Sequence, residues 1–171
     1  MAKPGVRLRV MLDANVLFAA TLGPRWPYEV IAHARKGDFQ LVLAPVVIDA
    51  ARDGLTKRFP HAVERFASLL RLLSYEAVAD PSATLVARNR DLVRDVTDIP
   101  VALAAIRARV DYLVSEDKDL TAQDKTTEKL RRRLTVLLSG TFLREVMGWT
   151  SDELERVRGR TWRDIERTKS I

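Results

Sequence analysis

Acidic residues stand at several places in the chain where a folded sheet could bring them together. Asp13 and Asp117 follow short apolar runs, Asp49 and Asp98 lie near the starts of expected helices, and Asp95 precedes Asp98 by three residues. Open α/β sheets bind ligands outside the carboxyl ends of their strands. Carboxylates gathered there raise one another's pKa, and a bound divalent cation removes that cost. The pattern therefore predicts a site for Mg²⁺ or Mn²⁺, which prefer oxygen ligands.

Each acidic residue also has an ordinary structural explanation. Asp98 alone is typical of a helix N-cap, and Asp49 alone is typical of an acid in a first helical turn. Asp117 and Asp119 alone would form a solvated turn. Asp13 resists such an explanation because it ends an apolar strand and is followed by Ala-Asn-Val-Leu. The joint pattern, and not any single residue, favours a metal site.

The elements that must position these residues alternate between strands and helices. Apolar runs predict strands at 6–12, 39–43, 75–79, 111–115 and 134–139. Helical periodicity, breakers and caps predict helices at 28–36, 45–58 and 61–73, from 98 onward, and at 141–148 and 151–162. Segment 80–97 shows no clear periodicity. The alternation predicts an α/β fold of three layers, α/β/α, around a central parallel sheet of about four to five strands.

Length and composition restrict the class of protein. A chain of 171 residues with 47% hydrophobic residues suits one domain with a substantial core. No apolar run approaches the roughly 18 residues of a membrane-spanning helix, so we expect no membrane partner. The chain has no cysteine, which excludes disulfides and thiolate metal sites. Together with the N-terminus, which shows no signal peptide, this composition favours a cytoplasmic location.

Positive charge is concentrated in the last quarter of the chain. Residues 125–171 hold 12 Lys and Arg against 7 Asp and Glu, whereas residues 1–124 hold 17 against 16. The densest part is a run of three arginines, Arg131, Arg132 and Arg133. Such a surface attracts nucleic acid, although a solvated helix face is the alternative. Trp149 and Trp162 could stack on bases, but we favour their anchoring the C-terminal helix.

Two segments resemble the PIN domain family of metal-dependent nucleases, which includes the VapC-like toxins of toxin–antitoxin pairs. VMLDANVLFAA resembles the opening strand of that family with its Asp-x-Asn signature. DIPVALAAIRARVDYLVSEDKDL resembles the family's acidic residue, alanine-rich helix, strand and Thr/Ser-x-Asp loop. This second segment is the more specific, because it combines four elements in fixed order over 23 residues. The resemblance covers about residues 8–140.

The resemblance carries functional roles to residues of this chain. It implies a catalytic site of four acidic residues around one or two metal ions: Asp13, Asp49, Asp98 and Asp117. It implies metal ligation by Asp13, Asp98 and Asp117, with Asn15 and Ser115 as polar supports. Asp95 and Asp119 flank this set, and we expect them in an outer shell or at a second ion.

One residue departs from the family pattern. The family usually has Glu where this chain has Asp49. The shorter side chain retracts the carboxylate by about 1.5 Å, the length of one carbon–carbon bond. We therefore expect Asp49 to reach a metal through water, or to weaken its binding.

The leading interpretation is a Mg²⁺- or Mn²⁺-dependent endoribonuclease that serves as the toxin of a toxin–antitoxin pair. Residues 6–140 would form a PIN-like nuclease domain, and 141–171 a C-terminal helical extension of the same domain. The resemblance implies an RNA substrate, an antitoxin protein and, because such toxins are often dimers, a homodimer. Two alternatives stay open. One is a catalytically weak or inactive module that binds RNA or a partner, and the other is a DNA-directed nuclease.

Overall fold

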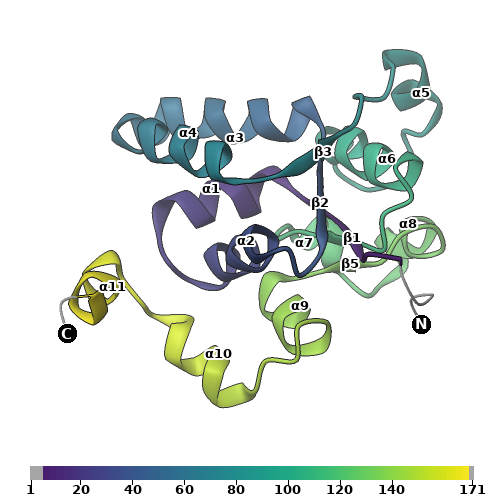
Figure 1. Cartoon of the computed structure of the whole chain (residues 1–171). Helices are drawn as coiled ribbons and strands as arrows, with labels where there is room; N and C mark the ends of the chain where they lie inside the picture. Colours follow the sequence, from purple (N-terminus) through teal and green to yellow (C-terminus); the bar gives the residue numbers. More distant parts are fainter. Residues whose placement is uncertain (1–5, 170–171) are drawn as a thin grey trace.

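The computed structural model describes residues 6–169 and is built on one sheet of five parallel strands (Figure 1). The strands are β1 (Arg9–Leu12), β2 (Gln40–Leu43), β3 (Tyr75–Ala77), β4 (Tyr112–Val114) and β5 (Val136–Leu137). They lie in the order β3-β2-β1-β4-β5, and every neighbouring pair is parallel. The predicted fold class is confirmed. The last two residues of the expected extension, 170 and 171, lie outside the described residues.

Helices connect the strands and cover both faces of the sheet. Those before β4 are α1 (Ala14–Leu22), α2 (Trp26–Lys36), α3 (Pro45–Arg58), α4 (Val63–Leu72), α5 (Ala83–Arg88) and α6 (Ile99–Arg107). Those after β4 are α7 (Lys118–Thr121), α8 (Glu128–Arg131), α9 (Ser139–Glu145), α10 (Ser151–Arg158) and α11 (Trp162–Lys169). Short 3-10 turns are η1 (Pro60–Ala62), η2 (Val96–Asp98) and η3 (Lys125–Thr127). Figure 1 shows α3 and α4 on one side of the sheet and α2 and α9 on the other. Within residues 6–169, no helix has the length and apolar character needed to cross a membrane.

The two strands at the middle of the sheet are apolar because both of their faces are covered. Val10, Met11 and Leu12 of β1 are fully buried, and β2 residues 41–43 are at most 1% exposed. Strands buried on both faces appear in sequence as continuous apolar runs instead of alternating patterns. Both runs were therefore recognisable before the structure was known.

Helix α1 was not predicted from the sequence, although it directly follows Asp13. Its residues are apolar on nearly every side, with Val16, Leu17 and Ala20 buried and Phe18 packed against the core. The helix lies among α2, α3 and α4. An enclosed helix has no polar face, so it lacks the 3.6-residue alternation by which amphipathic helices are detected.

The C-terminal extension also differs from the prediction. The single helix expected at 151–162 is two helices, α10 and α11, which break at Gly159. The capping box of Thr150 and Glu153 starts α10 as predicted. Trp149 donates from Nε1 to His33 Nε2 at 2.8 Å, and Trp162 donates from Nε1 to the Leu22 carbonyl at 3.3 Å. The two tryptophans therefore anchor the extension, as the sequence analysis favoured.

Helix α9 is fixed to the sheet by an aromatic cluster, and its loss should destabilise the fold. Phe142 is fully buried and meets the rings of Phe39 and Tyr112 at centroid distances of 5.5 and 6.0 Å. We expect Phe142→Ala to lower the free energy of unfolding by about 3–5 kcal/mol. Urea denaturation measures this loss. Leu138→Ala, at a residue 41% exposed just before the same helix, should change it by no more than about 0.5 kcal/mol.

Candidate metal centre

Strands β1 and β4 lie side by side in the sheet and end next to each other. Their carboxyl ends bring Asp13 close to the loop that carries Asp117. The Asp13 amide donates to the Val114 carbonyl at 2.9 Å, which extends the pairing of β1 and β4 by one residue. From β1 the chain builds outward through β2 to β3 on one side, and β4 and β5 lie on the other. The carboxyl ends of β1 and β4 are thus the topological switch point, where open α/β sheets bind ligands.

Asp13 is held in one orientation by hydrogen bonds to both of its carboxylate oxygens. Oδ1 accepts from the Ala14 amide at 2.7 Å, so the residue also caps α1. Oδ2 accepts from the Ser115 hydroxyl at 2.7 Å and from the Asn15 side-chain amide at 3.3 Å. Burial of this carboxylate, which is 6% exposed, raises its pKa, and the hydrogen bond from Ser115 opposes the shift. Asn15 and Ser115 thus occupy the positions predicted for polar supports.

The loop after β4 is tied to the same network. The Ser115 hydroxyl accepts from the Asp117 amide at 3.0 Å, and the Asn15 side-chain carbonyl accepts from the Glu116 amide at 3.0 Å. Asp117 in turn caps α7, because its Oδ1 accepts from the Asp119 amide at 2.8 Å. These contacts fix the direction in which the loop carries its two aspartates.

Asp98 does not act as the helix cap that its sequence position suggests. It precedes α6, but its side chain makes no capping hydrogen bond to that helix. Its Oδ2 is buried and has no hydrogen-bond partner within the described part of the chain. Burial, followed by the nearby charge of Asp117, raises the pKa of Asp98 to about 8, with smaller contributions from Asp13 and Asp95. The two carboxyl groups of Asp98 and Asp117 are close enough to share a hydrogen bond when one is protonated.

Asp95 and Asp119 lie close to Asp98. One carboxylate oxygen from each of the three residues lies within 4.8 Å of the other two. Asp95 Oδ1 accepts from the amide and the hydroxyl of Thr97, and these hydrogen bonds lower the pKa of Asp95. Asp98 therefore stands between two pairs of carboxylates, one formed by Asp13 and Asp117 and the other by Asp95 and Asp119.

Asp49 lies in a different setting from the other aspartates. It is the fifth residue of α3, beyond the first turn, and its side chain is 66% exposed. Its Oδ1 pairs with the Arg52 guanidinium at 3.3 Å. Asp49 is not among the charges that chiefly raise the pKa of Asp13 or Asp98, and it is not part of the compact group around Asp98. The sequence resemblance implied a catalytic role for Asp49, with its shorter side chain reaching a metal through water or weakening its binding.

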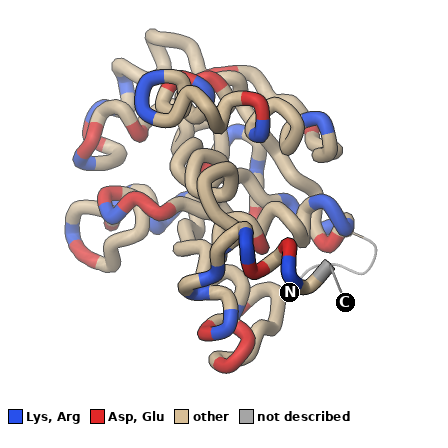
Figure 2. The backbone as a smooth tube through the Cα atoms, turned by 90° about the vertical axis from the view of Figure 1, so that its left-hand side faces the viewer, with Lys and Arg blue, Asp and Glu red and all other residues tan. Residues whose placement is uncertain are grey.

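The predicted nucleic-acid-binding arginines are partly engaged with the protein itself. Arg131 donates to the Thr127 hydroxyl at 3.0 Å and to the Asp124 carbonyl at 2.8 Å. Arg132 pairs with Glu128 at 2.6 Å. Figure 2 shows Lys and Arg interspersed with Asp and Glu along the chain. Of the three arginines, Arg133 is the one whose side chain makes no hydrogen bond or ion pair in the described part of the chain; its backbone amide donates to the Leu130 carbonyl at 2.9 Å.

The acidic group fits a hard divalent cation. Every candidate ligand is a carboxylate oxygen, which suits Mg²⁺ and Mn²⁺ and not the metals that favour thiolate or imidazole. A buried carboxylate oxygen without a partner normally costs free energy of folding. Oδ2 of Asp98 lacks a hydrogen-bond partner, and a bound cation or proton would supply one.

Sequence reasoning left the place of two residues of this group open. Asp95 and Asp119 were expected in an outer shell or at a second ion, and each has a carboxylate oxygen in the compact group. Two sequence signals pointed to these residues. One was the three-residue spacing of Asp95 and Asp98 around a turn, and the other was the pair of aspartates at alternate positions after Ser115, Asp117 and Asp119. Neither signal was decisive, because each also fits an ordinary Asx turn.

The raised pKa of Asp98 predicts a pH-dependent stability in the metal-free protein. An aspartate of usual pKa 3.8 that titrates near 8 when folded binds its proton more tightly in the native state. Its contribution to stability is therefore complete below pH 4 and is lost as the pH rises toward 8. In EDTA, Asp98→Asn should be more stable than wild type at pH 8, by on the order of 1 kcal/mol. Urea titrations at several pH values should show this difference shrinking toward pH 5, and a constant difference would contradict the assignment. Asp49→Asn is the exposed control and should show no such trend.

Comparisons with known proteins identify the family and the fold. A family model described as PIN domain matches residues 9–119. No curated protein sequence matches the chain. Among solved structures, PAE2754 from Pyrobaculum aerophilum is 19% identical with a TM-score of 0.53, and the match covers 83% of this chain and 97% of that chain.

Two further structures share the fold. VapBC2 from Rickettsia felis, solved bound to a DNA fragment from its promoter, is 19% identical with a TM-score of 0.52, covering 77% of this chain and 98% of that chain. FitAcB from Neisseria gonorrhoeae is 14% identical with a TM-score of 0.53, and the match covers 76% of this chain and 97% of that chain. The family match spans the first strand, the helix after Asp98 and the loop that carries Asp117 and Asp119. The chain belongs to the PIN domain family, whose members are generally nucleases that use divalent metals.

Proposed function

We propose that the protein is a divalent-metal-dependent endoribonuclease that serves as the toxin of a toxin–antitoxin pair. The observation that carries the proposal is the environment of Asp98. This residue stands among four other carboxylates with one buried oxygen that no protein group satisfies. Strongly shifted carboxylates that converge at a strand-end switch point are typical of functional sites.

The ligands in this proposal are Asp13, Asp98 and Asp117, as the sequence resemblance implies, with Asp95 and Asp119 able to complete the set. Mg²⁺ or Mn²⁺ bound there would polarise the scissile phosphate and lower the pKa of a bound water. A cation would also relieve the repulsion that raises the pKa of Asp98. Without a cation, a pKa of about 8 leaves Asp98 largely protonated near neutral pH, and this proton relieves the same repulsion.

The polar residues around the site have a positioning role in this proposal. Ser115 and Asn15 hold the Asp13 carboxylate in place, and they fix the loop that carries Asp117. Pre-set ligand orientation limits the rearrangement needed when a cation and a phosphodiester bind. Arg133, whose side chain has no hydrogen bond or ion pair within residues 6–169, is the predicted arginine best suited to contact a substrate phosphate.

A second candidate is a catalytically weak PIN domain that binds RNA or a partner protein. The position of Asp49 favours it, because this residue pairs with Arg52 on an exposed helix face. A site that lacks the carboxylate of the second strand–helix unit would hold its cation with fewer ligands. The neighbouring oxygens of Asp95 and Asp119 favour the active form, since they raise the number of available ligands.

Substitution of the acidic residues tests the nuclease proposal. Purified protein should cleave single-stranded RNA in Mn²⁺, and EDTA should abolish the cleavage. Asp98→Asn and Asp13→Asn should each reduce the rate by about 100-fold or more, as when a group acting at a reaction centre is removed. Asp49→Asn should stay within about threefold of wild type if Asp49 lies outside the site. Rates are measured on a labelled oligonucleotide, with the matching DNA oligonucleotide in parallel.

Three outcomes would separate the alternatives. Equal rates for wild type and Asp98→Asn would mean a contaminant or no activity, and would favour the binding module. Cleavage of DNA but not RNA would replace the ribonuclease with a DNA-directed nuclease. A higher rate in Asp49→Glu would show that the native site is weakened at this position. Thermal stabilisation by Mn²⁺, present in wild type and reduced in Asp98→Asn, reports metal binding without reference to activity.

The toxin role rests on the resemblance to VapC-like toxins and on the fold shared with VapBC2 and FitAcB. We expect induced expression to stop growth of a bacterial host, and co-expression of the neighbouring upstream gene to restore it. Asp98→Asn is the matched control and should not affect growth. Unimpaired growth with wild-type protein at equal expression would contradict a toxin. Analytical ultracentrifugation of the protein, alone and with the upstream product, tests the proposed homodimer and antitoxin complex.

A further inference from the structure

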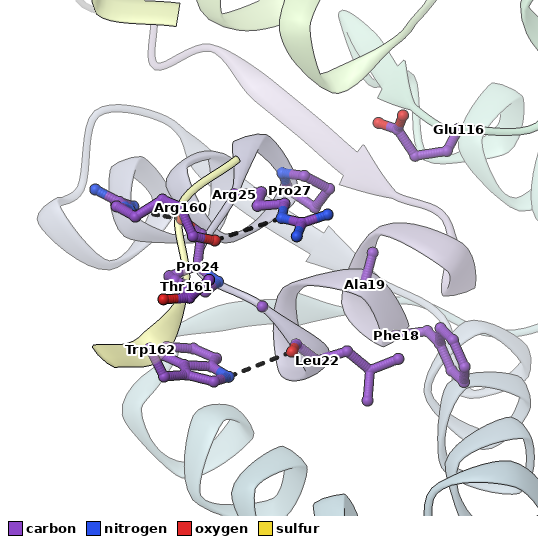
Figure 3. Close-up of a pocket in the computed structure, with 11 residues that line it drawn as sticks. Phe18, Ala19, Leu22, Pro24, Arg25, Pro27, Glu116, Arg160, Thr161 and Trp162 are labelled. Carbon is purple, nitrogen blue, oxygen red and sulfur yellow. Dashed lines mark hydrogen bonds between the residues drawn. The ribbon is translucent and has the colours of Figure 1, made fainter. Parts of the chain in front are cut away.

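We propose that the C-terminal extension completes a pocket that holds a nucleobase of the substrate beside the acidic centre. The inference rests on the proposed function in taking the substrate to be a nucleic acid. The pocket has a volume of about 440 Å³ and lies between α1, the α1–α2 connection and the segment 160–162 (Figure 3). This size falls in the range of about 300–1,000 Å³ that is typical of small-molecule sites.

The walls of the pocket come from two distant parts of the chain. Helix α1 contributes the apolar side chains of Phe18, Ala19 and Leu22. The extension contributes the opposite wall through Arg160 and Trp162, which Figure 3 shows across the cavity from Phe18. The family match ends at residue 119. This wall therefore belongs to the part of the chain beyond the matched domain.

The wall formed by the extension is fixed in place before any ligand binds. Arg160 donates from Nε to the Pro24 carbonyl at 2.7 Å and forms an ion pair with Glu29. Trp162 lies under the Arg65 guanidinium at 4.4 Å and meets the Tyr28 ring at right angles. A rigid wall limits the ordering cost of binding, which is the usual advantage of a preformed pocket.

Glu116 connects the pocket to the acidic centre. It lines the pocket, and it lies in sequence between Ser115 and Asp117. Its amide is bonded to Asn15, one of the groups that orient Asp13. In our proposal, a base held in this pocket lies beside the loop that carries Asp117, and it belongs to a nucleotide near the phosphate that the acidic centre would bind.

The polar groups of the pocket match a base better than a phosphate. The Arg25 side chain is exposed, and only its Nε has a partner, a 3.4 Å hydrogen bond to the Arg160 carbonyl, so its terminal nitrogens can donate. Glu116 Oε1 accepts from the Ser139 amide at 2.9 Å, which leaves Oε2 as an acceptor. The carboxylate would repel a phosphate, whereas it can accept from a base amino group. Arginine pairs with ring and carbonyl acceptors of bases, guanine above all, and apolar side chains support the ring.

This chemistry predicts a preference among bases. Guanine, adenine and cytosine offer both an amino donor and an acceptor, whereas uracil has no amino group. In EDTA, GMP should bind at least about fivefold more tightly than UMP. The measurement is a nuclear magnetic resonance titration that follows the indole N–H signal of Trp162, assigned with Trp162→Phe.

Two variants that each remove one positive charge, at Arg25 and at Arg35, test whether GMP binding depends on Arg25. Arg25→Ala should weaken GMP binding by about tenfold or more. Arg35→Ala, at an exposed arginine of α2 whose side chain has no hydrogen bond or ion pair within residues 6–169, should leave it unchanged. Glu116→Gln should reduce the preference for GMP over UMP. In cleavage assays Arg25→Ala should raise KM while kcat stays within about twofold.

The failure of this inference and the failure of the proposed function give different results. Asp98→Asn should bind GMP like wild type even though it does not cleave, because the pocket does not include Asp98. Absence of RNA cleavage together with selective GMP binding would overturn the nuclease and keep the pocket. Cleavage by wild type with no GMP binding, or with equal binding of GMP and UMP that Arg25→Ala does not change, would overturn the pocket.

Discussion

The hydrogen bond from the Ser115 hydroxyl to Asp13 joins the ends of the two central strands, and the acidic centre is arranged around it. A buried carboxylate is costly unless it is hydrogen-bonded. Ser115 meets that requirement and at the same time accepts from the Asp117 amide. One hydroxyl therefore fixes the orientation of an aspartate on β1 and the start of the loop after β4. The positions of Asp117 and Asp119 follow from this contact.

The centre that results is electrostatically unfavourable in the absence of a cation. Asp98 has a buried oxygen without a partner and a pKa raised to about 8. A fold selected only for stability would place an asparagine or an apolar residue there. Native proteins usually tolerate such a conflict at functional sites, where a ligand relieves it. The conflict is the physical link between this fold and the metal-dependent activity that we propose.

The C-terminal extension lies outside the matched part of the chain and packs against α1 and α2. Trp26 donates to the Leu154 carbonyl, and Trp149 and Trp162 bond to α2 and to the end of α1. These contacts place the extension against α1, the helix that begins at Asp13. The extension can thereby shape the surroundings of the site without supplying an acidic residue to it. The same contacts explain why its tryptophans are held in place by the protein.

Much of the fold could be predicted from the sequence, because burial on both faces leaves continuous apolar runs for β1 and β2. Asp13 and Asp117 could be proposed as site residues, since each follows an apolar run, that of β1 or of β4. Helix α1 escaped detection because a helix enclosed on nearly all sides has no polar face to reveal its period. The break between α10 and α11 escaped as well, since Gly159 in a polar helical pattern is only a weak signal.

The sequence by itself determined which residues follow strands and which precede helices. Only the tertiary structure decided which carboxylates share an electrostatic environment. Asp49 and Asp98 both lie near the start of a helix. Asp49 pairs with Arg52 on an exposed face, whereas Asp98 lies among the other carboxylates. The reason is that the pKa of a carboxyl group and its affinity for a metal depend on distances through space. Asp13 and Ser115 are 102 residues apart in the sequence, and they are neighbours only because β1 pairs with β4.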